Sequence, residues 1–188
     1  MSLDFRALWA EALPYHAFVA ASTEHRGLWD GLYRIARLPD DVAGLSFEDR
    51  PVKLLALAED WCGDASNTLP IVARLAEAVP GLELRVLRRD EYPAVMDEYL
   101  TGTARAIPII IGLDTEFKEI GHWGPRPVAL QEWVSANRMR VPKGELYPQV
   151  RRWYAKDRGA STVRELLETA VTGSPSPAPL RVPARVPA

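Results

Sequence analysis

The hydrophobic pattern of the chain predicts four β-strands in its middle. Residues 52–58, VKLLALA, form a continuous apolar run of strand length, as expected for a strand that is buried on both faces. Residues 82–88, LELRVLR, alternate apolar and polar positions, which predicts a second strand. Two further apolar stretches, 107–114 and 117–123, are separated by turn residues at 114–116 and predict a β-hairpin.

Between and after these strands, apolar residues recur at helical spacing. Residues 64–79 predict a helix that Pro80-Gly81 ends, residues 92–100 a short helix, and residues 128–139 an amphipathic helix. The predicted order from residue 52 is therefore β-α-β-α-β-β-α. This order indicates an α/β fold with a central mixed β-sheet flanked by helices.

The composition changes along the chain and suggests four parts. Residues 1–45 predict a helical N-terminal extension, residues 46–140 the main domain, and residues 141–171 a C-terminal helical extension. Residues 172–188 hold five of the sixteen prolines and little that could be buried. We expect this last segment to be a flexible, Pro-rich tail.

Overall composition narrows the class of protein. The 188 residues are 47% hydrophobic and 26% charged, which is ordinary for a folded domain, and the net charge is −2. Because the basic residues form no stripe, nucleic acid is not an expected partner. The N-terminus does not resemble a signal peptide, and no apolar run reaches the length of about 18 residues that a membrane span needs. We therefore expect a cytoplasmic protein with no membrane partner.

One short stretch carries the candidate chemistry: ALAEDWCGDASNTLP, residues 56–70. It contains Cys62, the single cysteine of the chain, between a predicted strand and a predicted helix. A sulfur at a helix N-terminus has its thiolate stabilised by free N–H groups, by about 0.3–1 kcal/mol. With one cysteine, no disulfide can form within the chain, which favours a reducing compartment.

These features together resemble the thioredoxin-like family. Trp61 directly precedes Cys62, and Pro70 follows eight residues later, as in the active-site helix of thioredoxins. Ile107-Pro108 matches the family's cis-proline, which would face the sulfur, and Arg105 lies three residues before that proline. The stretch Trp-Cys-Gly-Asp-Ala, with IPIIIGLD and HWGPRP downstream, also resembles a bacterial group of single-cysteine thioredoxin-family proteins. The resemblance covers about residues 50–138 and implies a thioredoxin-like fold.

Two departures from the thioredoxin pattern limit the chemistry. Ala65 stands where the second, resolving cysteine would be, and Ala56 stands where thioredoxins have the buried acid that serves it. Without a second thiol to deprotonate, a buried carboxylate would only destabilise the fold. An intramolecular dithiol–disulfide cycle is therefore excluded. Whether the chain is an enzyme depends on what Cys62 does alone.

The ionisation of Cys62 is left open by the sequence. The amides of Gly63–Ala65 would favour the thiolate, whereas a carboxylate about 5 Å away, on Asp64, would disfavour it by about 0.8 kcal/mol even at the dielectric constant of water. If Asp64 instead caps the helix, its charge is partly compensated there. The sign of the shift in the Cys62 pKa does not follow from these residues.

Other side chains are candidates for the groove around Cys62. The resemblance implies that Trp61, Ile107 and Pro108 shape that groove. It also places the loop HWGPRP beside it, so that a ligand could contact one or more of these side chains: Arg105, His122, Trp123 and Arg126. For Trp123 the alternative is a core position and for Arg126 a surface position.

Two functions remain open on the sequence alone. The first is a monothiol redox site, in which Cys62 exchanges with a low-molecular-weight thiol or a protein thiol or disulfide and an external thiol resolves it. The second is a non-catalytic binding module on a thioredoxin scaffold. Iron–sulfur binding as in monothiol glutaredoxins matches weakly because Gly-Asp-Ala follows the cysteine, and no spacing supports a zinc site with Asp64 and His122. We expect no cofactor and no metal.

Overall fold

The computed structural model describes residues 3–173, and within them a single mixed β-sheet has the strand order β1-β3-β2-β4-β5. The central strands β2 and β3 are parallel, and the other neighbouring pairs are antiparallel. The strands are β1 (Leu13–Pro14), β2 (Val52–Ala58), β3 (Leu82–Arg88), β4 (Ile109–Leu113) and β5 (Glu119–Trp123). The α/β fold with a central mixed sheet is thus confirmed.

The helices follow the predicted order. They are α1 (Phe5–Glu11), α2 (Tyr15–Ala20), α3 (Arg26–Ile35), α4 (Gly63–Ala78), α5 (Pro93–Met96), α6 (Val128–Asn137), α7 (Lys143–Asp157) and α8 (Ala160–Leu166). A π-helical turn, Leu167–Val171, continues α8. Short 3-10 turns lie at Asp40–Val42, Arg89–Glu91 and Asp97–Tyr99.

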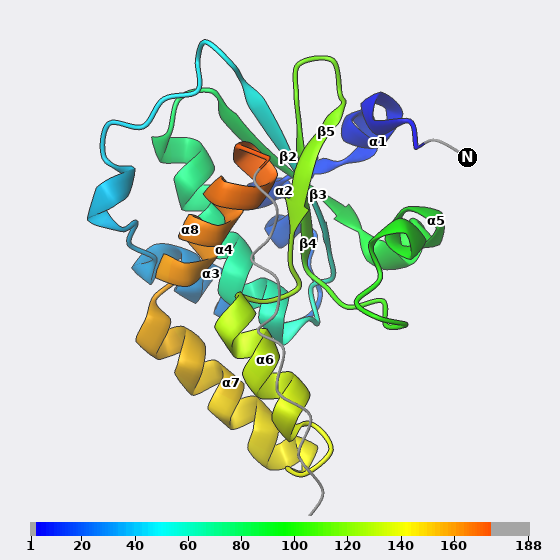
Figure 1. Cartoon of the computed structure of the whole chain (residues 1–188), viewed down its shortest axis with the longest axis vertical. Helices are drawn as coiled ribbons and strands as arrows, with labels where there is room; N and C mark the ends of the chain where they lie inside the picture. Colours follow the sequence, from blue (N-terminus) through cyan, green and yellow to red (C-terminus); the bar gives the residue numbers. More distant parts are fainter. Residues whose placement is uncertain (1–2, 174–188) are drawn as a thin grey trace, which may run out of the picture.

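The helices cover the sheet unequally. Helix α4 packs against α3 and α8 on one face, whereas α1 and α5 lie toward the other side (Figure 1). Helices α6 and α7 pack side by side and extend beyond the end of the sheet. This pair has a small apolar cluster of its own, formed by Leu130, Val134, Val150 and Tyr154.

The burial of β2 in the core explains why its sequence is a continuous apolar run. Its residues Leu54–Ala58 are all fully buried, because strands lie on both sides of it and helices cover both faces. Ala56 is among them, so the position where thioredoxins keep a buried acid is apolar and enclosed here. The continuous apolar run is therefore a central strand, as predicted.

Several details differ from the sequence prediction. Strand β1 was not expected, because two residues that include a proline carry no period; it pairs Leu13 with Val86. Strand β5 begins at Glu119 rather than at residue 117, because Phe117 has a positive φ of 65° in the hairpin turn. The predicted helix 92–100 is divided into α5 and a 3-10 turn.

The described residues include most of the predicted C-terminal extension but not the predicted tail from residue 174 onward. Most of the predicted C-terminal extension is helical, as α7, α8 and the π-helical turn. The predicted Pro-rich tail lies, from residue 174 onward, outside the described residues. Within residues 3–173, no helix combines the length and the apolar character that crossing a bilayer requires.

Candidate functional site

Cys62 lies at the N-terminus of α4, as predicted. It is the N-cap residue, and its Sγ accepts a hydrogen bond from the N–H of Ala65 at 3.4 Å. The thiol in turn donates to the carbonyl oxygen of Ile107 at 3.5 Å. Only 7% of Cys62 is exposed. The sulfur is thus held between the first turn of α4 and the segment that precedes β4.

The sheet register places Pro108 beside this sulfur. Strand β4 pairs antiparallel with β2, with Ile109 opposite Leu57, so the residues before β4 meet the residues after β2. The Ile107–Pro108 peptide bond is cis. The structure therefore brings Cys62, Ile107 and Pro108 together, as the sequence resemblance implied.

Asp64 has partners that the sequence did not reveal. Its Oδ1 accepts hydrogen bonds from Nε of Arg126 at 2.9 Å and from the hydroxyl of Tyr154 at 3.0 Å, while Nη2 of Arg126 binds Oδ2. The side chains of Arg126 and Asp64 are 17% and 8% exposed. Asp64 therefore neither caps α4 nor stands as an uncompensated charge beside the sulfur, the two possibilities that the sequence left open.

Burial decides the ionisation of Cys62. Removal of the thiol from water raises its pKa, and the hydrogen bond from the N–H of Ala65 lowers it. Burial is the larger effect, and the pKa of Cys62 is raised to about 11. The charge of Asp64 raises the pKa further and that of Arg126 lowers it. At pH 7 a thiol with a pKa of about 11 is ionised in about one molecule in ten thousand. The resting form of Cys62 is therefore the thiol.

Trp61 is the exposed side chain next to Cys62. It is 45% exposed, and the guanidinium of Arg89 lies 5.0 Å from the centre of its ring. Nη1 of Arg89 also donates to the carbonyl oxygen of Arg105 at 3.0 Å. Arg105 thus contributes its backbone here, whereas its guanidinium pairs with Asp97 in solvent.

The predicted ligand contacts on β5 have partners within the chain. Trp123 is buried, and its indole N–H donates to Oε2 of Glu165 at 3.0 Å. Trp123 therefore has the core position that the sequence left as the alternative. Nδ1 of His122 lies 2.9 Å from Oε1 of Glu119. Of the loop HWGPRP, Arg126 is the residue that reaches the first turn of α4.

Sequence reasoning missed the two acids that precede Trp61. Glu59 and Asp60 are both buried; Oε1 of Glu59 accepts from the N–H of Asp90 at 2.8 Å, and Oδ2 of Asp60 accepts from the N–H of Thr23 at 2.8 Å. Nη1 of Arg88 lies 3.5 Å from the first carboxylate and 3.7 Å from the second. These contacts hold the loop before Cys62 against the N-terminal extension and the loop after β3.

A metal site is not indicated by the described side chains. Among residues 3–173, no three His, Cys, Asp or Glu residues are grouped so that they could hold a metal ion. The free cysteine is Cys62 itself. The chemistry that this arrangement can perform rests on one sulfur and the hydrogen-bonding groups around it.

Comparison with known proteins gives the same fold. A family model described as Thioredoxin matches residues 12–140. A protein of unknown function from Pseudomonas aeruginosa has 19% sequence identity and a TM-score of 0.67, over 87% of this chain and 95% of that chain. An HIV epitope scaffold has 19% identity and a TM-score of 0.63, over 86% of this chain and 94% of that chain. No curated protein matches.

Proposed function

This chain belongs to the thioredoxin family, and we propose that it is a monothiol exchange protein in which Cys62 reacts with external disulfides and an external thiol resolves the product. The observation that carries the proposal is the position of Sγ, at the first turn of α4, 3.4 Å from the N–H of Ala65 and 3.5 Å from the carbonyl oxygen of Ile107. The chain has no other cysteine, so the resolving sulfur must come from another molecule.

The exchange proceeds in two balanced steps. The Cys62 thiol first loses its proton to solvent, and the thiolate attacks one sulfur of a disulfide RSSR. The S–S bond of RSSR breaks, a Cys62–S–SR bond forms, and RS⁻ leaves and takes up a proton. An external thiol R′SH then attacks the outer sulfur as its thiolate, which releases RSSR′ and returns Cys62 to the thiolate and, after protonation, to the thiol.

The surroundings of Cys62 suggest what each neighbour does in these steps. The N–H of Ala65 donates to the sulfur and favours the thiolate as it forms. Arg126 compensates the charge of Asp64, so that the thiolate does not form beside an unpaired carboxylate. Trp61, exposed next to the sulfur, offers an apolar surface to the approaching molecule. The substrates that fit are low-molecular-weight or protein disulfides.

A second function, a non-catalytic binding module, is favoured by one observation. Burial keeps Cys62 protonated, with a pKa of about 11, and a thiol is a poor nucleophile. On that alternative, Cys62 is a packing residue and the thioredoxin scaffold holds a partner. The two functions differ in whether the folded chain forms a mixed disulfide at all.

Reaction with glutathione disulfide separates them. At mildly alkaline pH, mass spectrometry of the intact folded chain is expected to show one glutathione added per chain, and added glutathione should remove it. Cys62→Ser should show no adduct. If only the urea-unfolded chain forms the adduct, the folded thiol is structural and the binding module is the better description.

A further inference from the structure

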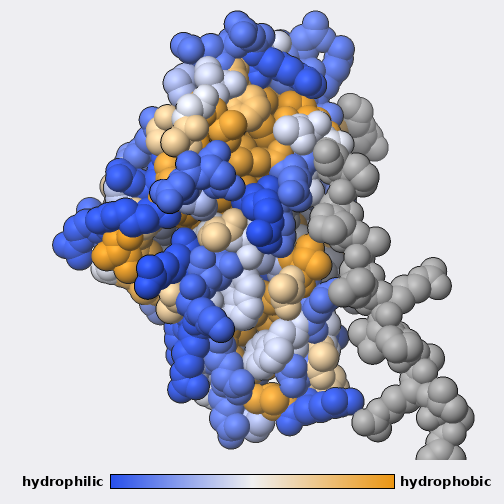
Figure 2. Space-filling model, turned by 60° about the vertical axis from the view of Figure 1, so that its left-hand side comes forward, coloured by the Kyte–Doolittle hydropathy of each residue, from blue (hydrophilic) through white to orange (hydrophobic). Residues whose placement is uncertain are grey.

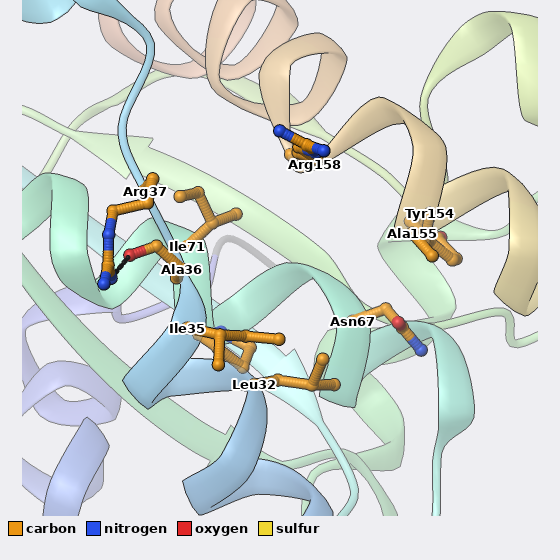
Figure 3. A pocket seen from close by; sticks show the side chains of 11 residues that line it. Leu32, Ile35, Ala36, Arg37, Asn67, Ile71, Tyr154, Ala155 and Arg158 are labelled. Carbon is orange, nitrogen blue, oxygen red and sulfur yellow. Dashed lines mark hydrogen bonds between the residues drawn. The ribbon is translucent and has the colours of Figure 1, made fainter.

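A cavity of about 350 Å³ lies between α3, α4 and the α7–α8 junction, and Cys62 is not among its lining residues. Figure 3 shows side chains of all three regions around it, with Leu32, Ile35 and Ile71 from α3 and α4 and Arg158 from the α7–α8 junction. Its volume is in the range of small-molecule sites, which starts at about 300 Å³. The exchange chemistry of Cys62 uses none of these lining residues as a reacting group.

The interior of the cavity is apolar. Leu32 and Ile35 of α3 face Pro70 and Ile71 of α4 across it, and Ala155 of α7 adds to the lining. Ile35 is 67% exposed although it is a large aliphatic residue. Figure 2, which brings this side of the molecule forward, shows apolar residues gathered in patches between hydrophilic rims. An apolar body of small size would remove this surface from water.

The charged side chains that line the cavity are all positive. Arg37 and Arg158 line the cavity, and no Asp or Glu does. Arg37 donates from Nη1 to two backbone carbonyls, those of Arg34 and Ala36. Among the residues that the structure describes, the guanidinium of Arg158 has no hydrogen bond or ion pair. An apolar cavity with cationic groups and no acid is complementary to an anion that carries an apolar body.

We propose that this cavity binds a small amphipathic carboxylate. The apolar body lies against Leu32, Ile35 and Ile71, and the carboxylate pairs with Arg158, with Arg37 adding a second positive charge. The guanidinium fork of Arg158 matches a carboxylate with two parallel hydrogen bonds. This site is independent of the proposed exchange at Cys62.

Octanoate is the probe for the full chain, with binding followed by calorimetry and by NMR shifts. Saturable binding of one octanoate per chain is expected. Arg158→Gln should weaken it roughly tenfold or more, because a charge-assisted pair is lost. Arg151→Gln, on α7 but outside the cavity lining, should leave the affinity unchanged. The neutral octanamide should bind at least several-fold more weakly than octanoate.

A second pair of variants tests the apolar part. Ile35→Gln should weaken octanoate binding, whereas Leu28→Gln, on the same helix and 41% exposed but not in the lining, should not. No saturable binding would overturn the proposal. So would octanamide binding as well as octanoate, which means an apolar groove without anion recognition, or binding that Arg158→Gln and Arg151→Gln affect alike.

Discussion

Replacing Arg126 with methionine is expected to lower the free energy of unfolding by about 3–5 kcal/mol, because it leaves the charge of Asp64 buried without its counterion. Asp64 would retain the hydroxyl of Tyr154 as a partner, but a neutral donor does not replace a guanidinium. Urea unfolding of the folded chain, followed by fluorescence, measures the change.

Two control variants make this result specific. Arg105→Met breaks an ion pair of the same type with Asp97, but the two side chains are 51% and 49% exposed, so the loss of stability should be much smaller than for Arg126→Met. The double variant Arg126→Met/Asp64→Asn removes both charges and should recover a large part of the lost stability. A loss for Arg126→Met as small as that for Arg105→Met would show that the Asp64 pair behaves as a surface pair.

The second large effect is expected at Gly112 on β4. A Cβ atom on Gly112 would lie 1.5 Å from the carbonyl oxygen of Ala170, in the π-helical turn that packs against β4 and β5. Because the obstacle is backbone, either β4 or the turn must move. Gly112→Ala is expected to lower the free energy of unfolding by about 3 kcal/mol or more.

Gly31→Ala is the matched control for this substitution. Gly31 lies inside α3, and a Cβ there would meet no atom within 4 Å. Alanine at this partly exposed helical position should raise stability by about 0.5–1 kcal/mol. Opposite signs for the two glycines, measured by the same urea unfolding, are the expected result. Equal effects would contradict the close approach of the π-helical turn to β4.

The sequence predicted those parts of the fold that short-range patterns determine. The apolar run 52–58 could be recognised as a central strand because all of its residues except Lys53 are buried. Cys62 could be placed at a helix start because strand, cysteine and helix follow directly in the chain. Strand β1 could not be found in this way, because its two residues pair with β3 about 72 positions away and carry no period.

The environment of the site depended on distant contacts. Asp64 binds Arg126 and Tyr154, which lie 62 and 90 residues away, and no spacing rule joins them. The sign of the Cys62 pKa shift followed from how far the fold buries the sulfur, which a local pattern does not report. Arg126 was singled out in the sequence as a ligand contact; its contact with Asp64 emerged only from the fold.

The pH dependence of Cys62 reacting with glutathione disulfide tests the proposed exchange most directly. Because burial raises the pKa of the thiol to about 11, the thiolate fraction should grow about tenfold for each pH unit below that value. The rate for the folded chain is therefore expected to keep rising between about pH 7 and about pH 10 without a plateau. The urea-unfolded chain, whose thiol has an ordinary pKa, should level off earlier. A plateau of the folded chain near neutral pH would contradict the buried, protonated thiol, and the absence of any adduct even at the alkaline end would contradict exchange through Cys62.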